Sequence, residues 1–225
     1  MRKLIVGLVI EMVVFAGLLV LPAGTWGWWR AWVFLGVFFV AATAVMAVPF
    51  PGKQELFKER LKPPVQKGQP PADKVVLILL IASFCGLLVF IPLDVFRFHW
   101  LGKPAPFVSA LGLAVCFAGY WIAFRAVREN AFATVVVRHQ EERQQKVIDT
   151  GLYGVIRHPL YAGLILFIVG VPLWLESYAG VLFSAIPIAA IILRTVAEER
   201  FLKRELQGYN AYMERVRYRL VPYLW

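Results

Sequence analysis

The chain alternates between long apolar runs and short, strongly charged segments. Six apolar runs stand out, at Leu4–Leu21, Trp28–Val48, Val75–Leu93, Phe107–Phe124, Pro159–Leu175 and Tyr178–Val196. Each approaches the roughly 20 residues that a helix needs to cross a hydrocarbon core about 30 Å thick. The pattern predicts an all-α fold, a polytopic integral membrane bundle of about six transmembrane helices, followed by a cytosolic helical tail at the C-terminal end.

Composition supports a membrane protein and narrows the chemistry. Hydrophobic residues make up 60% of the 225-residue chain, against about 45–50% in soluble domains. Cys85 and Cys116 both fall inside apolar runs, so we expect buried thiols rather than a disulfide or a zinc cluster. The three histidines lack ligand spacing, and no metal site is predicted.

The formal net charge of +10 is explained by membrane topology rather than by nucleic-acid binding. The basic residues gather in four regions: the N-terminus, residues 49–74, residues 125–158 and the tail from 194. Of the 24 basic residues, only Arg30, Arg97 and Lys103 lie outside these regions. With six spans these four regions face the same side, which the positive-inside rule identifies as the cytosol. We therefore expect cytosolic termini in the inner or plasma membrane, contacts with lipid headgroups, and no nucleic-acid partner.

Two parts of the chain are expected. Residues 1–74 form a transmembrane hairpin followed by a basic, Pro-rich loop, and residues 75–225 form a core with four spans and the tail. The first span is predicted to be retained rather than cleaved as a signal peptide. Glu11 lies in the middle of that span, where we expect it to be paired inside the bundle; its role is left open.

Polar residues with catalytic potential gather after Arg125. The run Arg157-His158-Pro159 predicts a helix that begins at Pro159 with His158 at its cap, because the residue before proline avoids the helical region. Tyr161 lies in the same first turn. Arg157 and the helix dipole make this end cationic, which suits an anionic group; a simple membrane anchor is the competing interpretation.

A second polar cluster follows the last apolar run. Glu198 and Glu199 are adjacent, so on a helix their side chains diverge by about 100°. One carboxylate can then face inward while its neighbour pairs with a base such as Arg194 or Lys203. The tight hairpin between residues 159 and 196 returns these carboxylates to the membrane face that carries His158.

This half of the chain resembles the isoprenylcysteine carboxyl methyltransferase family and its phospholipid and thiol methyltransferase relatives. The resemblance covers about residues 125–222. It rests on Thr150-Gly151-x-Tyr153, Arg157-His158-Pro159-x-Tyr161-x-Gly163, Glu198-Glu199-x-x-Leu202 and Tyr209-x-x-Tyr212-x-x-Arg215-Val216. The chain departs from the family at Leu206-Gln207-Gly208, where relatives often carry Phe-Gly.

The resemblance implies a methyltransferase that uses S-adenosylmethionine and a lipophilic or small-molecule acceptor. Tyr153, Arg157, His158, Tyr161, Glu198 and Glu199 are the implied cofactor-binding residues, and Arg215 and Glu199 the implied catalytic ones, with Arg215 facing the acceptor. Methyl transfer from a sulfonium is an in-line displacement that depends on positioning and on exclusion of water. The chain lacks the G-x-G-x-x-G pattern of a Rossmann-type site.

Several functions are compatible with these site residues. O-methylation of a carboxylate on an isoprenylcysteine-like acceptor is favoured, because a carboxylate is already ionised at neutral pH and needs no general base. N-methylation of a phospholipid and S-methylation of a small thiol remain open. Outside the methyltransferases, a small transporter is the competing class. A sterol-type reductase would share the architecture but would need a nicotinamide cofactor. A transporter would place its polar groups at mid-membrane, whereas here they gather near one interface.

Overall fold

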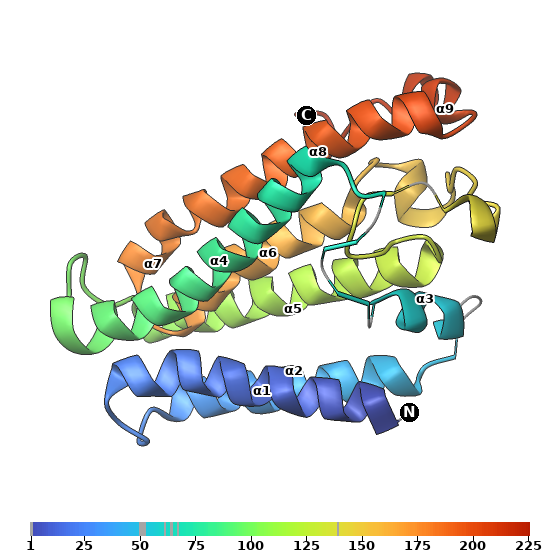
Figure 1. The fold of residues 1–225 in the computed structure, drawn as a ribbon. Coiled ribbons are helices and arrows are strands. Elements are labelled where there is room, and N and C mark those ends of the chain that lie inside the picture. The colour runs from blue at the N-terminus through green and yellow to red at the C-terminus, as the bar shows by residue number, and fades with distance from the viewer. Residues whose placement is uncertain (1, 50–52, 61, 64, 67, 139) are drawn as a thin grey trace. The chain divides into compact units, whose positions relative to one another are not determined.

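The computed structural model describes residues 2–49, 53–60, 62–63, 65–66, 68–138 and 140–225. The helices are α1 (Arg2–Ala23), α2 (Trp29–Ala47), α3 (Lys53–Arg60), α4 (Pro71–Leu93), α5 (Pro106–Glu129), α6 (Pro159–Trp174), α7 (Tyr178–Phe183), α8 (Ala185–Glu205) and α9 (Tyr209–Arg215) (Figure 1). Helical turns of other types occur at Asp94–Phe98, Glu141–Arg143 and Gly151–Gly154. Within the described ranges there is no strand, only one isolated bridge between Ile156 and Tyr218. The all-α prediction is confirmed.

Five described segments are long and apolar enough to cross a membrane. They are Ile5–Ala23, Trp29–Ala47, Pro71–Phe98, Pro106–Glu129 and Tyr178–Glu205, and they match five of the six predicted spans. The sixth prediction corresponds to α6, an apolar helix of 16 residues. At 1.5 Å per residue this helix is about 24 Å long, shorter than a full hydrocarbon core. The polytopic membrane architecture is confirmed.

Prolines and a serine cap define the predicted hairpin after α6. Pro172 lies inside α6, and Glu176 adopts a left-handed conformation with φ 68° in the turn that follows. Ser177 then caps α7 by accepting a hydrogen bond from the Gly180 amide at 2.8 Å. The chain is interrupted at Ser184, between α7 and α8. Pro187 lies in the first turn of α8, where its missing N–H costs no hydrogen bond.

The chain forms two compact units. Unit 1 comprises Met1–Pro49, Ala82–Phe117 and Phe167–Ile186. In this unit the buried Asp94 accepts hydrogen bonds from the Ser177 hydroxyl at 2.7 Å and the Trp100 amide at 2.9 Å. Arg30 and Trp174 donate to each other's carbonyl oxygens. Glu11 is exposed on α1, because α1 buries Leu8, Leu19 and Val20 instead; the predicted pairing inside the bundle is wrong.

Unit 2 comprises Phe50–Ile81, Ala118–Leu166 and Pro187–Trp225. Its helices α5 and α6 touch backbone to backbone at Gly163, where a Cβ atom would lie 2.6 Å from the Gly119 carbonyl oxygen. Glycine is required at this crossing because any side chain would separate the two helices. The helix α3, which was expected to be loop, buries Leu56 completely against Val127 and Leu160. The division predicted near residue 74 stays a prediction.

Candidate active site

The candidate site lies in unit 2 around the first turn of α6. The helix begins at Pro159 as predicted, and the His158 carbonyl accepts the Ala162 amide at 3.1 Å, which makes His158 the cap residue. The two residues before the helix are held by the C-terminal segment. The Arg157 and His158 amides donate to the Tyr218 and Arg219 carbonyls, each at 2.9 Å. These bonds fix both side chains at the start of the helix.

Glu199 is a buried clasp between α8, the start of α6 and the C-terminal segment. Its Oε1 atom accepts from Arg157 Nε at 2.6 Å and lies 3.3 Å from His158 Nε2. Its Oε2 atom accepts from Arg219 Nε at 2.9 Å. Arg157 also donates 2.7 Å hydrogen bonds to the Val216 and Arg217 carbonyls. With both oxygens engaged, Glu199 holds Arg157 and His158 in place from outside the cavity.

Glu198 points in a different direction from Glu199. It accepts a 2.5 Å hydrogen bond from the Tyr161 hydroxyl, and it lines the cavity described below, whereas Glu199 does not. The sequence predicted that the two carboxylates diverge, and this is confirmed. The bases that neutralise Glu199 are Arg157 and Arg219, rather than the suggested Arg194 or Lys203.

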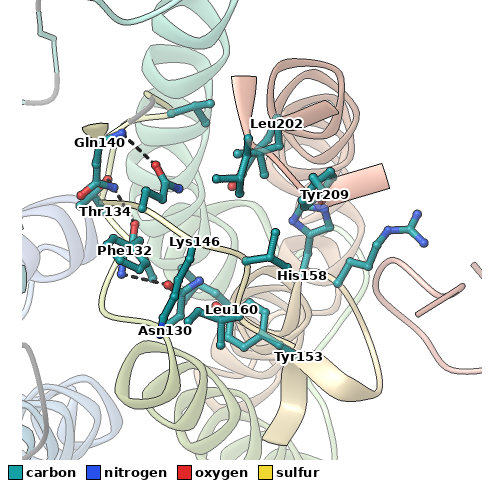
Figure 2. A pocket seen from close by; sticks show the side chains of 18 of the residues that line it. Asn130, Phe132, Thr134, Gln140, Lys146, Tyr153, His158, Leu160, Leu202 and Tyr209 are labelled. Carbon is teal, nitrogen blue, oxygen red and sulfur yellow. Dashed lines mark hydrogen bonds between the residues drawn. The ribbon is translucent and has the colours of Figure 1, made fainter. Parts of the chain in front are cut away.

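A cavity opens beside these residues and encloses about 820 Å³ of empty space, its open mouth included. Figure 2 shows Asn130, Phe132 and Lys146 on one side, with His158 and Tyr209 on the other. The complete lining is Asn130, Phe132, Ala133, Thr134, Val136, Val137, Arg138, Gln140, Gln145, Lys146, Val147, Ile148, Tyr153, Arg157, His158, Leu160, Tyr161, Glu198, Leu202, Leu206, Tyr209 and Tyr212.

Three of the lining phenols are neutral donors rather than bases. Burial raises the pKa values of Tyr153, Tyr209 and Tyr212 well above the ordinary phenol range. Tyr212 donates to the Tyr153 carbonyl at 2.7 Å, which ties α9 to the turn before α6. Tyr209 and Tyr212 also pack with Leu206 and Val216 in one apolar cluster. This cluster gives the cavity an apolar wall suited to a flat aromatic ring.

The turn that carries Tyr153 has its own support. Gly151 adopts φ +57°, and a Cβ atom there would collide with the Glu129 carboxylate. Glu129 Oε2 accepts the Leu152 amide at 2.7 Å, while Arg125 binds the other oxygen at 2.8 Å. Glycine at this position therefore lets the end of α5 hold the turn that places Tyr153 in the cavity.

Arg215 lies apart from the other predicted site residues. It is the last residue of α9, its side chain is 65% exposed, and it forms a 2.7 Å ion pair with Asp149. The structure brings Tyr153, Arg157, His158, Tyr161 and Glu198 together around the cavity with Glu199 behind them, but does not bring Arg215 there. A surface pair of this kind contributes little free energy and is readily exchanged.

Sequence reasoning missed several polar residues of the site. Arg219 completes the Glu199 clasp, and Asp73 forms a buried ion pair with Arg194 at 3.2 Å. Asp73 stands 121 residues before Arg194 in the chain, so no local pattern linked them. An arginine inside the last apolar helix was the available signal, because an unpaired cation there is costly. Individual roles in the segment 130–148 were also not predicted.

The chain is similar to known methyltransferases. A family model described as phospholipid methyltransferase matches residues 107–207, which include Tyr153, Arg157, His158, Tyr161, Glu198 and Glu199. The probable protein-S-isoprenylcysteine O-methyltransferases of Oryza sativa subsp. indica and subsp. japonica are each 26% identical over 192 residues, covering 83% of this chain and 93% of theirs. Protein-S-isoprenylcysteine O-methyltransferase B of Arabidopsis thaliana is 25% identical over 149 residues, covering 63% of this chain and 70% of that protein.

Proposed function

We propose that this chain, an integral membrane methyltransferase of the isoprenylcysteine carboxyl methyltransferase family, transfers a methyl group from S-adenosylmethionine to a carboxylate on a lipophilic acceptor. The observation that carries the proposal is the Tyr161–Glu198 hydrogen bond at the wall of the unit 2 cavity, backed by the Glu199 clasp. Bound there, S-adenosylmethionine supplies an electrophilic methyl group on a sulfonium. The residues of the chain bind it, orient it and exclude water.

Each group in the cavity suits one part of that cofactor. Glu198 is a carboxylate that can accept hydrogen bonds from ribose hydroxyls or from the ammonium group of the amino acid part. Arg157 and the dipole of α6 favour the cofactor's carboxylate. The apolar cluster around Tyr209 and Leu206 suits the adenine ring. Glu199 acts through Arg157 and His158, whose positions it sets.

A carboxylate acceptor suits the ionisable groups that line the cavity. Such an acceptor is ionised at neutral pH and can attack the methyl carbon without a base. The neutral phenols that line the cavity are unsuited to remove a proton from an amine or a thiol. Arg215 is the proposed acceptor-orienting residue, because an incoming carboxylate can replace Asp149 in its exposed ion pair.

Membrane orientation follows from the distribution of charge. We place the cavity and both termini on the cytosolic side, since the basic residues gather at the N-terminus, in residues 49–74 and 125–158, and in the tail from 194. Lipid headgroups and a lipophilic acceptor would then be available from the bilayer, while the soluble cofactor enters from the cytosol.

N-methylation of a phospholipid is the second candidate, because the matching family model carries the phospholipid methyltransferase description. An amine acceptor must lose a proton before it attacks, and His158, at the edge of the cavity, is the available base. S-methylation of a small thiol would make the same demand.

Acceptor chemistry is resolved by a radiolabel experiment. The protein, purified in detergent and returned to lipid vesicles, is supplied with S-adenosylmethionine labelled in its methyl group. An S-prenylated N-acetylcysteine, phosphatidylethanolamine and a small alkyl thiol are offered separately. The proposal predicts label in the prenylated compound that mild alkali releases as methanol, the signature of a methyl ester. Alkali-stable label in the phospholipid would instead establish the second candidate.

A further inference from the structure

One wall of the cavity is the irregular segment 131–137, which turns at residues 131–132, bends at residues 135–136 and is held by side chains from three helices. The Ala133 carbonyl accepts from Arg60 Nε and Nη2, the Val135 carbonyl accepts from Arg194 Nη2, and the Val137 amide donates to Asp73 Oδ2 at 3.1 Å. These side chains come from α3, α8 and α4, respectively. The contacts supply hydrogen-bond partners for backbone groups that lie outside any helix.

Alternate anchoring has a direct consequence for the cavity. Thr134 and Val136 lie between the three anchored residues, so the anchors restrict where these two residues can lie. Both line the cavity, and the Thr134 hydroxyl donates to the Val136 carbonyl at 3.0 Å. The shape of this wall is therefore set by the side chains behind it.

Two of the anchors are themselves an ion pair. Arg194 Nε lies 3.2 Å from Asp73 Oδ1, and the side chains are only 6% and 3% exposed. Asp73 also accepts a 2.7 Å hydrogen bond from Gln69. Arg194 lies inside the last apolar segment, where an ionisable residue is a functional hypothesis by default. The pair thus places opposite charges against one short piece of backbone.

The same arginine reaches the candidate cofactor-binding residues. Arg194 and Glu198 are four residues apart on α8, which puts them on one face of the helix. Between them stands Tyr161, whose hydroxyl donates to Glu198 and whose ring centroid lies 6.0 Å from Arg194 Cζ. Arg194 is therefore in position to fix both the segment 131–137 and the Tyr161–Glu198 hydrogen bond.

We propose that the buried Asp73–Arg194 ion pair is the positioning device of the cofactor pocket, holding residues 131–137 and Tyr161 in the arrangement that binds the methyl donor. This inference rests on the proposed function, since the donor is S-adenosylmethionine. Neither Asp73 nor Arg194 lines the cavity. They act through the wall and through Tyr161.

The test compares two buried aspartates. Asp73→Asn keeps an oxygen for the Val137 amide but removes the charge opposite Arg194. The matched control is Asp94→Asn in unit 1, which removes the charge of another buried aspartate with two hydrogen-bond donors. Isothermal titration in detergent should show the Kd for S-adenosylmethionine raised about tenfold in Asp73→Asn, the scale of one charge-assisted hydrogen bond. Asp94→Asn should lower Tm and leave this Kd unchanged.

A paired substitution separates positioning from stability. Asp73→Asn combined with Arg194→Gln leaves no buried charge unpaired, so its Tm should exceed that of either single variant. Its Kd for S-adenosylmethionine should nevertheless remain raised, because the charged anchor of Val135 is gone. Recovery of both Tm and Kd in the double variant would show that the ion pair only stabilises the fold, which overturns the inference.

Hydrogen–deuterium exchange tests the wall without any ligand. In Asp73→Asn the amides of residues 131–137 should exchange faster than in the wild type, while those of Asp94→Asn should not. Failure of the wild type to bind S-adenosylmethionine would refute the proposed function and leave this exchange result interpretable. Normal binding by the wild type and by Asp73→Asn, with unchanged exchange, would refute the inference alone.

Discussion

Tyr161 donates a 2.5 Å hydrogen bond to Glu198, joining the first turn of α6 to α8 at the wall of the cavity. The two residues are 37 positions apart and come together because the hairpin between α6 and α8 returns the chain to the same end of unit 2. The bond orients a cavity-lining carboxylate while the neighbouring Glu199 is occupied with Arg157 and Arg219.

Removing the Tyr161 hydroxyl should weaken cofactor binding. Tyr161→Phe leaves the ring in place but takes the donor from Glu198, and a hydrogen bond to a charged group contributes about 1.5–3 kcal/mol. The Kd for S-adenosylmethionine, measured by titration calorimetry, should rise about tenfold or more. Tyr223→Phe, at a phenol that is 89% exposed, is the control and should leave Kd unchanged. Equal affinity in both variants would count against a role for Tyr161.

The adjacent glutamates should differ in what their replacement damages. Glu199→Gln breaks a buried ion pair with Arg157, so Tm should fall markedly, with a loss on the order of 3 kcal/mol in the free energy of unfolding. Glu198→Gln should retain the Tm of the wild type and lose affinity for S-adenosylmethionine. Thermal unfolding and titration of both variants measure the two effects separately. The assignment fails if Glu198→Gln is destabilised and still binds normally.

The crossing of α5 and α6 should not tolerate a methyl group. In Gly163→Ala the new Cβ would meet the Gly119 carbonyl and the Ala123 amide nitrogen, and such overpacking typically costs about 1–3 kcal/mol. Since α6 carries His158 and Tyr161 at its start, binding of S-adenosylmethionine should weaken together with Tm. Gly36→Ala, where nothing lies within 4 Å of the added atom, is the matched control. A Tm unchanged from the wild type in Gly163→Ala would show that the two helices can separate freely.

The pH profile should identify the acceptor class. A carboxylate remains ionised and burial keeps Tyr209 and Tyr212 protonated, so the methylation rate at saturating substrate should be nearly flat between about pH 6 and 9. An ammonium acceptor would give a rate that increases up to about tenfold per pH unit over this interval. Initial rates measured separately with the prenylated acceptor and with phosphatidylethanolamine, in buffers of constant ionic strength, decide between the two.

The membrane helices were predicted well from the sequence because apolar runs of this length with few charges are typical of membrane spans and rare in soluble domains. The helix start at Pro159 was also located, since proline restricts the residue before it. The short helix α3 was missed because its run Lys53–Arg60 is highly charged, and its buried contact through Leu56 is visible only in the folded chain. The length of α6 was slightly overestimated.

For the candidate site, local motifs were informative and long-range pairs were not. Tyr153, Arg157, His158, Tyr161 and Glu198 were predicted from short patterns, and the structure brings them together. The partners of Glu199 and of Arg194 come from distant segments, and no periodicity encodes them. Glu11 was expected to be paired and is exposed, because the face on which a helical residue lies depends on packing that a uniformly apolar run does not specify.

Whether the unit 2 cavity binds the methyl donor is tested most directly by calorimetric titration of the purified, folded protein with S-adenosylmethionine, alongside NADPH and the Glu199→Ala and His158→Ala variants. We expect saturable binding of S-adenosylmethionine in the micromolar range, its loss in both variants, and no binding of NADPH. Wild-type affinity in both variants would contradict the site, and binding of NADPH without S-adenosylmethionine would contradict the function.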